Sequence, residues 1–293
     1  MTYVCSKEEK EYLARYDISA YERPSLATDI VVFSILNDGV SDNIRKLQKK
    51  SLKVLLIKRA SYPYKDCWAL PGGFLRPGED VIANATRELF EETGVSDAYL
   101  QLVGTYGEKG RDPRGWIVSN TFMALVDGNK CTPRAGTDAW EARWFSVELI
   151  KGDAENSSTV NYTLRFINEE TGQELVAELQ EHKVYRNFHR TVSYEIVSGG
   201  GIAFDHAKIV LNALLSLREN VENNLKVAFN LMPEMFTLTE LQNAFEIILD
   251  KKLLTANFRR KIADYVDETD KIIEGAGHRP AKLFKRKIEV FYD

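Results

Sequence analysis

The fold of this chain is decided by residues 73–95, which read GFLRPGEDVIANATRELFEETGV. The stretch fits the spacing G-x5-E-x7-R-E-(apolar)-x-E-E-x-G-(apolar) at every position. Acidic residues directly after Gly78 favour a helix start, and Gly94 favours a helix stop, because glycine readily adopts the left-handed conformation. One arc of the predicted helix holds four apolar residues that we expect to pack inward: Val81, Ile82, Ala85 and Leu89.

The predicted helix carries three glutamates on its other arc. Glu88, Glu91 and Glu92 stand at i, i+3 and i+4, so their carboxylates are expected to converge and repel one another. A hard divalent cation relieves this repulsion, and Mg²⁺ accepts a few carboxylates while leaving positions open for substrate phosphates. The same spacing places Arg87 within reach of Glu91. A solvated acidic face is the alternative, but the two glycines, Glu79 and Arg87 in register favour a metal site.

In this spacing the chain resembles the Nudix family. The resemblance implies an α/β/α sandwich and hydrolysis of a nucleoside diphosphate linked to another moiety, with Mg²⁺ or Mn²⁺ polarising the pyrophosphate and activating a water. The implied metal ligands are the backbone carbonyl of Gly72 and the carboxylates of Glu88, Glu91 and Glu92. The implied catalytic residues are Glu79, Arg87, Glu88, Glu91 and Glu92. The general base of several subfamilies lies on a later loop, and the candidates here are Glu108, Asp112, Asp138 and Glu141.

Length and composition agree with a soluble globular protein. The 293 residues suffice for one large domain or two ordinary ones, and 44% hydrophobic with 28% charged residues is typical of such chains. No apolar run approaches the roughly 18 residues of a membrane span, so no membrane partner is expected. The three cysteines form no C-x-x-C pair, which argues against a disulfide framework or a thiol zinc site and fits a reducing cytoplasm.

Helices and strands alternate in a mixed α+β pattern up to about residue 225. A helix is predicted over 6–15 and another from Phe204 to about Glu219. β-rich runs are predicted at 29–36, 52–57, 99–106, 116–126 and 142–147. The segment 151–200 contains a predicted hairpin and a further strand at 192–197, and we interpret it as an insertion that forms a rim or a dimer arm. We therefore assign residues 1–225 to the Nudix domain, with this insertion inside it.

A charged loop, GRDPRGW, occupies residues 110–116. On its own it is typical of a solvent loop with a local arginine–aspartate pair. After a Nudix box it is similar to a loop of Nudix proteins that recognise ADP-ribose. Arg111, Asp112 and Arg114 are therefore candidate substrate-binding residues, with an arginine that forks onto a diphosphate or pairs across a dimer.

The last segment, residues 226–293, predicts a winged helix-turn-helix domain. A capping box at Thr237–Glu240 opens one helix, and Thr255 is expected to cap a second helix whose start carries Asn257 and three cations. A basic hairpin follows. The candidate DNA-binding residues are Asn257, Arg259, Arg260, Lys261, Arg279 and Lys282. A helical interaction tail with a basic face is the alternative.

The segments 236–242, 257–261 and 279–284 resemble the C-terminal domain of Nudix-related transcriptional regulators of NAD metabolism. Two functions follow from this resemblance: hydrolysis of ADP-ribose or a related diphosphate coupled to duplex DNA binding, or regulation by a protein that only senses such a ligand. The regulators often have eroded boxes, whereas this box is complete, which favours retained hydrolysis. We also expect a homodimer, because winged helix-turn-helix regulators usually read paired half-sites.

Overall fold

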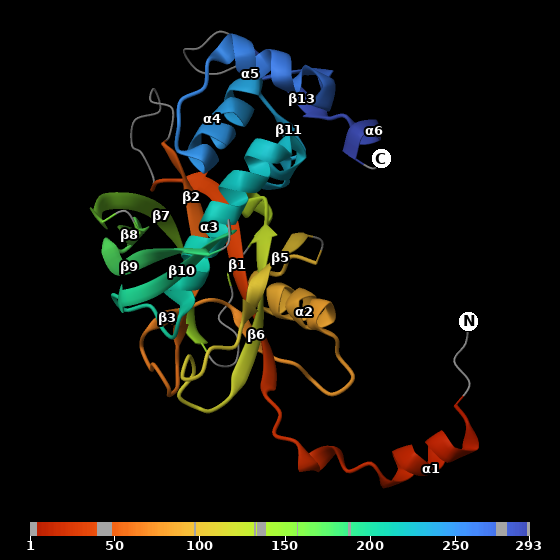
Figure 1. Ribbon diagram of the computed structural model, residues 1–293. Helices are drawn as coiled ribbons and strands as arrows, with labels where there is room; N and C mark the ends of the chain where they lie inside the picture. The colour runs from red at the N-terminus through yellow and green to blue at the C-terminus, as the bar shows by residue number, and fades with distance from the viewer. Residues whose placement is uncertain are drawn as a thin grey trace.

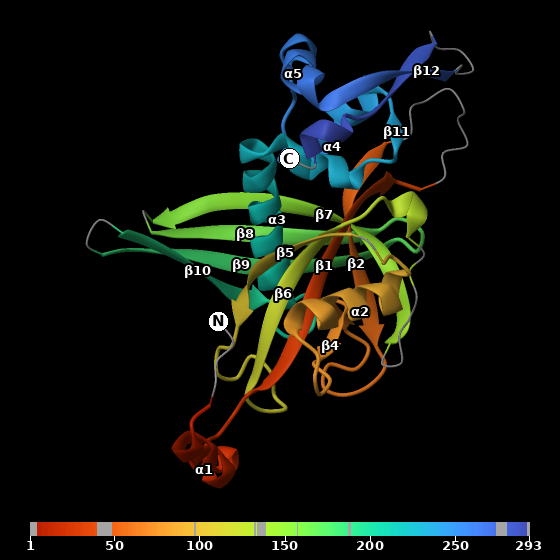
Figure 2. The same cartoon turned by 90° about the vertical axis from the view of Figure 1, so that its right-hand side faces the viewer.

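The computed structural model describes residues 5–39, 49–96, 98–131, 133, 139–156, 158–186, 189–273 and 280–291 (Figure 1). A large mixed sheet with a helix on each face forms the first part of the chain. A second, smaller body of helices and a three-stranded sheet follows it (Figures 1 and 2). None of the helices in the described ranges combines the length and the apolar character needed to cross a membrane.

Ten strands form the large sheet within the described residues. They are β1 (Ser25–Asn37), β2 (Lys50–Arg59), β3 (Trp68–Ala69), β4 (Gly72–Phe74), β5 (Tyr99–Tyr106), β6 (Ile117–Leu125), β7 (Ala139–Asn156), β8 (Thr159–Asn168), β9 (Gln173–Arg186) and β10 (His189–Ser198). The main path runs β10-β9-β8-β7-β2-β1-β6-β5, with β3 beside β2 and β4 beside β1. β1 and β6 are parallel, and the other pairs are antiparallel. Each strand run predicted from the sequence lies within or closely matches one of these strands.

Alternation along β1 distributes apolar side chains to the two faces of the sheet. Ile30 and Val32 join the cluster packed under α2 (Val81–Thr93), whereas Val31 and Phe33 join the larger cluster packed under α3 (His206–Asn223). The period of two along a strand separates these sets, so both faces of a central strand must be covered. The expected α/β/α sandwich is therefore present (Figure 2).

The segment 151–200 continues the large sheet. β7 pairs with β2 through its first half and with β8 through its second half, and β8, β9 and β10 follow as a meander. The predicted hairpin and the strand over 192–197 are both confirmed. Leu164, Phe166 and Leu179 are fully or nearly fully buried in the cluster under α3, so this segment contributes to the core of the domain. A role in dimer contacts stays a prediction.

Within the described residues, the C-terminal body contains three α-helices, two 3-10 helices and a three-stranded sheet. Its elements are the 3-10 helix η3 (Leu225–Leu231), β11 (Met235–Phe236), α4 (Leu238–Leu249), α5 (Thr255–Ile262), the 3-10 helix η4 (Ala263–Tyr265), β12 (Val266–Ile273), β13 (Ala281–Arg286) and α6 (Ile288–Phe291). Thr237 and Glu240 form the predicted capping box at the start of α4. The sheet order β11-β13-β12 places a two-stranded hairpin after the second helix, which is the predicted winged arrangement.

Two details of the second helix differ from the sequence prediction. The residue that caps α5 is Leu254, and it makes no side-chain cap hydrogen bond, so Thr255 is already the first helical residue. The helix is only eight residues long, which places Arg259, Arg260 and Lys261 in its last turn instead of at its start. Cations are favourable at that end because of the helix dipole, and a sequence pattern does not fix helix ends this closely.

The N-terminal helix α1 (Lys7–Arg15) confirms the helix expected over 6–15. No residue of α1 or of the following 3-10 helix η1 (Ile18–Ala20) is buried, and both project from the body before β1 begins (Figures 1 and 2). A further 3-10 helix, η2 (Gly128–Lys130), follows β6.

Candidate functional site

The helix of the Nudix box begins and ends where the sequence predicts. Asp80 is the N-cap of α2, and its carboxylate accepts hydrogen bonds from the backbone N–H groups of Ile82 and Ala83, at 2.9 and 2.8 Å. Gly94 ends the helix with φ 73°, a conformation that suits glycine because it has no Cβ. Both caps fix the position of the glutamates on α2 relative to the sheet.

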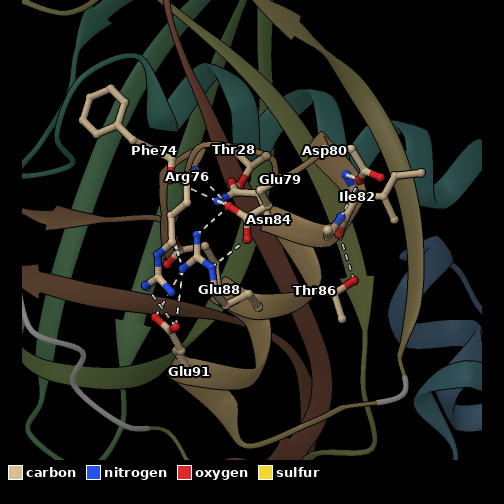
Figure 3. A network of polar contacts seen from close by, with 12 residues as sticks. Thr28, Phe74, Arg76, Glu79, Asp80, Ile82, Asn84, Thr86, Glu88 and Glu91 are labelled. Carbon is tan, nitrogen blue, oxygen red and sulfur yellow. Dashed lines mark hydrogen bonds and ion pairs between the residues drawn. The ribbon is translucent and has the colours of Figure 1, made fainter.

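The inward face of α2 differs from the one predicted. Ile82 is 61% exposed, so it does not pack inward with the other apolar residues. Asn84 takes the inward place and is fully buried. Its amide accepts a hydrogen bond from the Thr28 hydroxyl and donates to the Phe74 carbonyl and to Glu79, at 3.1 and 3.0 Å (Figure 3). Asn84 therefore ties α2 to β1 and to the loop before the helix, a role that the sequence did not indicate.

Arg87 has Glu79 as its main partner. Its Nε and Nη2 donate to the two carboxylate oxygens of Glu79, at 2.8 and 3.1 Å, while its contacts with Glu91 are 3.4 Å long. Arg87 does reach Glu91, as the spacing predicts, but the loop before α2 brings Glu79 closer. Hydrogen bonds from Arg87 and from the backbone of Arg76 lower the pKa of Glu79 to about 2. Glu79 is thus a fixed negative charge that orients Arg87.

Glu88 and Glu92 are 8% and 6% exposed, whereas Glu91 lies at the surface near Arg76. Burial raises the pKa of Glu88, although an ion pair with Arg87 at 2.7 Å opposes this shift. The Glu88 carboxylate lies directly against Gly73, where an added Cβ would stand 2.3 Å from Oε1. Any side chain at residue 73 would therefore displace this carboxylate, which explains the glycine at the start of the box.

The charge balance of this helix end fits a divalent cation. Arg76 and Arg87 pair with the carboxylates of Glu79, Glu88 and Glu91, and Glu92 adds a fourth carboxylate on α2, so the four carboxylates exceed the two guanidinium groups by two negative charges. The described residues contain no group of three acidic, histidine or cysteine side chains already set around one point. Arg87 instead lies among the carboxylates. The oxygen donors and the excess charge suit a divalent cation, and metal binding by the buried Glu88 and Glu92 stays a prediction.

The two arginines of the charged loop have different environments. Arg111 is buried, and its Nε and Nη2 donate to the two oxygens of Asp205, at 2.9 and 2.7 Å. Burial alone would lower the pKa of Arg111, but the bonds to Asp205 outweigh it and the pKa rises. In this structure Arg111 therefore pairs with Asp205, and its Nη2 also lies 3.5 Å from Asp29.

Arg114 lies at the rim of the same site. It pairs with the buried Asp112 at 2.7 Å, the local pair expected from the sequence, and its guanidinium lies 5.1 and 5.5 Å from the ring centroids of Phe74 and Phe204. Hydrogen bonds from Arg114 outweigh burial and lower the pKa of Asp112, which leaves that carboxylate charged and occupied. Arg114 is partly exposed next to the box, so it is the better placed of the two arginines for a bound diphosphate.

Asp29 and His206 connect these groups, and the sequence did not single out their contact. The Leu70 N–H donates to His206 Nδ1 at 2.9 Å, and His206 Nε2 lies 3.6 Å from Asp29. Burial lowers the pKa of His206, consistent with a neutral ring that accepts at Nδ1. Asp29 also accepts from Ser119 at 2.5 Å. His206 therefore has a structural role, as a buried contact between α3 and the strand region at Leu70. Asp29 could have been noticed in the sequence, because it is a charged residue at the start of the apolar run 29–36.

The candidates for the general base stay open. Glu108 is exposed and pairs with Lys208 at 2.8 Å, and Glu141 pairs with Arg143. Asp112 is held by Arg114, as described above. Asp138 lies outside the described residues.

The candidate DNA-binding residues line the exposed side of α5. Phe258 and Ile262 are the buried residues of α5, whereas Asn257, Arg259, Arg260 and Lys261 are exposed. On the wing, Lys282 is exposed and pairs with Glu268. Arg286 instead donates to the carbonyls of Phe229 and Met232, so this basic residue anchors the wing. Arg279 lies outside the described residues.

Comparisons with known proteins agree with this organisation. The family model of the NUDIX domain matches residues 43–166, and that of the NrtR DNA-binding winged helix domain matches residues 228–285. The ADPR responsive transcriptional repressor NtrR of Acinetobacter baylyi is 31% identical over 285 residues, which cover 96% of this chain and 89% of that protein. The ADP-ribose pyrophosphatase of Methanocaldococcus jannaschii is 44% identical over 102 residues, which cover 35% of this chain and 59% of that protein. The crystal structure of Shewanella oneidensis NrtR has a TM-score of 0.59 and 26% identity, with 89% of this chain and 94% of that chain covered.

Proposed function

This chain belongs to the NrtR family, in which a Nudix domain precedes a winged helix domain, and from that premise we propose that it is a transcriptional repressor regulated by ADP-ribose. Its winged helix domain binds duplex DNA, and a nucleoside diphosphate ligand in the Nudix site weakens that complex. The observation that carries the proposal is the likeness to the Acinetobacter repressor, named as ADPR responsive, over nearly the whole of both chains.

The surface of α5 supports the DNA-binding half of the proposal. Only two of its residues face the core, and the remaining side chains, polar or cationic apart from Ala256, are free to enter a groove of DNA. Asn257 stands in the first turn, where a recognition helix contacts base edges. The three cations of the last turn stand where a helix more often approaches the phosphate backbone.

The Nudix site supports the ligand-binding half. The metal-binding glutamates of α2 lie beside β4, and Arg114 stands next to Phe74 at the end of that strand. A metal ion held by Glu88 and Glu92, with the carbonyl of Gly72 and Glu91 as further ligands, would take the diphosphate oxygens. Arg114 can then contribute a guanidinium to the same diphosphate, since it is the partly exposed arginine of the loop.

Hydrolysis of the ligand is a second proposed activity, favoured by the complete catalytic box. Every position of the box is present, and the Glu79–Arg87 pair joins the helix to the loop before it. The 44% identity with an ADP-ribose pyrophosphatase over 102 residues points the same way. A protein that hydrolyses its own effector can still respond to it, so the two activities are compatible.

A turnover panel and a competition experiment test these two halves separately. The panel offers ADP-ribose, NADH, diadenosine polyphosphates and sugar nucleotides with Mg²⁺ or Mn²⁺, and we expect ADP-ribose to give AMP and ribose 5-phosphate. The competition compares DNA fragments from upstream of the protein's own operon with bulk DNA at roughly physiological salt. One preferred fragment, released by ADP-ribose, is the expected result, while equal affinity for every fragment contradicts the repressor proposal.

Two substitutions in α5 should separate base contacts from phosphate contacts. Asn257→Ala is expected to relax discrimination between the preferred fragment and its single-base variants, by roughly 1–3 kcal/mol at one position. Arg260→Ala should weaken binding to all fragments alike and reduce the salt slope by about 1, because its contact is with phosphate. Fluorescence anisotropy across a salt series measures both effects.

Lys151→Ala on β7 is the matched control, since it removes a cation far from α5 and should leave DNA binding unchanged. If Arg260→Ala alters discrimination and Asn257→Ala does not, the roles assigned to the two ends of α5 are reversed.

A homodimer is the usual state for reading paired half-sites, and it remains a prediction for this chain. Light scattering, which measures the molar mass in solution, tests it.

A further inference from the structure

The N-cap of α3 is an aspartate that does not cap its helix. Asp205 occupies the capping position, but its carboxylate makes no hydrogen bond to the N–H groups of the first turn. Both of its oxygens are instead held by Arg111. Aspartate is among the preferred N-cap residues, because its carboxylate can accept hydrogen bonds from the free N–H groups of the first turn and so stabilise the helix. The chain thus forgoes this stabilisation to hold a loop arginine.

Arg111 reaches the Nudix site through Asp29. Its Nη2 lies 3.5 Å from Asp29, whose neighbour Thr28 bonds to Asn84 of α2. Asp29 is also paired in register with Gly72, the residue whose carbonyl is an expected metal ligand. A diphosphate bound at α2 and β4 would therefore lie close to Arg111. The guanidinium of Arg111 is the group that holds both oxygens of Asp205.

The residue that precedes the uncapped aspartate is under strain. Phe204 adopts φ 54°, which is unfavourable for a large side chain. Its ring lies 5.0 Å from the guanidinium of Arg59 and 4.6 Å from the ring of Tyr64. The start of α3 is thus held in its present form by contacts around it, and such strain persists only where those contacts impose it.

The far end of α3 is attached to the winged helix. Arg218 Nε donates to the carbonyl of Ile248 at 3.1 Å and so satisfies a free carbonyl in the last turn of α4. Glu222 pairs with Lys251 in the turn between α4 and α5. With 18 residues, α3 spans about 27 Å, and one rigid element therefore joins the Nudix site to the turn before α5.

An open pocket lies between the winged helix and one end of the large sheet. It has a volume of about 980 Å³ and lies beside the contact of α4 with β2. Ile35 and Lys50 line it from the sheet, and Asn243 and Ile247 from α4. The winged helix is therefore attached to the large domain through α3 and η3, and its contact with β2 is bordered by this pocket.

We propose that Arg111 and Asp205 form a ligand-operated link that transmits occupancy of the Nudix site to the winged helix through α3. This proposal rests on the proposed function. Without ligand, Arg111 holds Asp205 and α3 keeps its uncapped start. The diphosphate attracts Arg111, Asp205 turns to cap the first turn of α3, and the helix shifts the turn that it holds through Arg218. Asp205 is a positioning residue, since it acts through α3 and does not contact the ligand.

Asp205→Asn tests the near end of the link. Asparagine can cap α3 but offers no charge to Arg111, so the variant should resemble the ligand-bound state. We expect its affinity for a duplex that the wild-type protein enriches from a random pool to fall by roughly 5- to 150-fold without ligand, the range typical of coupling between sites. Calorimetric affinity for ADP-ribose should be equal or higher. Asn212→Ala, which removes another contact of α3, to Tyr106, is the control and should leave both affinities unchanged.

Arg218→Gln tests the far end without touching the ligand site. It should bind ADP-ribose and the enriched duplex as the wild type does, but ADP-ribose should no longer weaken the DNA complex. If the wild-type protein responds to ADP-ribose and a folded variant responds as strongly, the link is wrong while the repressor proposal stands. If the wild type enriches no duplex or ignores ADP-ribose, the proposed function itself fails. Melting curves of both variants show whether each is folded, and either folded variant suffices to decide.

Discussion

Glu92→Gln is expected to lower the rate of ADP-ribose hydrolysis by about 10²-fold or more. Glu92 is one of two buried carboxylates on α2, and its charge is part of the excess that a divalent cation balances. Glutamine preserves the shape of the side chain and removes that charge, so the electrostatic stabilisation that the metal gives to the pyrophosphate is weakened. Initial rates with Mg²⁺ and with Mn²⁺ measure the effect.

A second measurement separates catalysis from folding. The wild-type protein should melt at a higher temperature when Mg²⁺ is added, because a ligand that binds only the folded state stabilises it. Glu92→Gln should lose most of this Mg²⁺-dependent increase and should fold normally without metal. Glu178→Gln, an exposed glutamate on β9, is the matched control. A Glu92→Gln protein that hydrolyses ADP-ribose as fast as the wild type would remove Glu92 from the metal site.

The same substitution distinguishes an enzyme from a sensor. If the wild type shows no turnover but ADP-ribose still releases DNA, the complete box serves ligand binding alone. In that case Glu92→Gln should raise the ADP-ribose concentration needed for release. If the wild type does hydrolyse ADP-ribose, a single addition of ADP-ribose should keep DNA released for longer with the variant than with the wild type. The reason is that the variant consumes the effector more slowly.

Sequence patterns predicted the parts of this fold that depend on local chemistry. The ends of α2 follow from Asp80 and Gly94, and the capping box predicted the start of α4, because each signal acts within a few residues. The strands were found through their apolar runs. The sequence predicted Thr255 as the N-cap of α5, which is one residue too late. The N-cap is Leu254, and an apolar side chain gives no capping signal in the sequence.

Long-range polar contacts could not be predicted in the same way. Arg111 and Asp205 are 94 residues apart and meet only because α3 folds back beside the loop after β5. The pattern of charges in 110–116 indicated a local pair or a ligand site, and it gave no sign of a buried partner elsewhere. Asn84 illustrates the same limit, because its partner Thr28 lies on β1 and no spacing within the box refers to it.

Phe229→Ala is expected to lower the free energy of unfolding by about 3–5 kcal/mol, the range for removing a buried phenylalanine. Phe229 is fully buried in η3, and its ring centroid lies 5.2 to 6.4 Å from those of four other aromatic rings. These rings belong to Phe236, Phe245, Tyr265 and Phe291. Urea unfolding followed by circular dichroism measures the loss, and Phe90→Ala, half exposed on α2, should change it by no more than about 0.5 kcal/mol.

The shape of that unfolding curve also tests whether the two domains fold independently. Phe229 lies just after the expected boundary at residue 226, yet it shares one apolar cluster with Leu217 and Val221 of α3. If the winged helix unfolds separately, Phe229→Ala should shift only one of two transitions, and ADP-ribose binding should persist after DNA binding is lost. If α3 makes the domains one cooperative unit, a single transition should shift as a whole. The second result would agree with α3 as a mechanical link, because a helix that is part of both cores cannot change at one end alone.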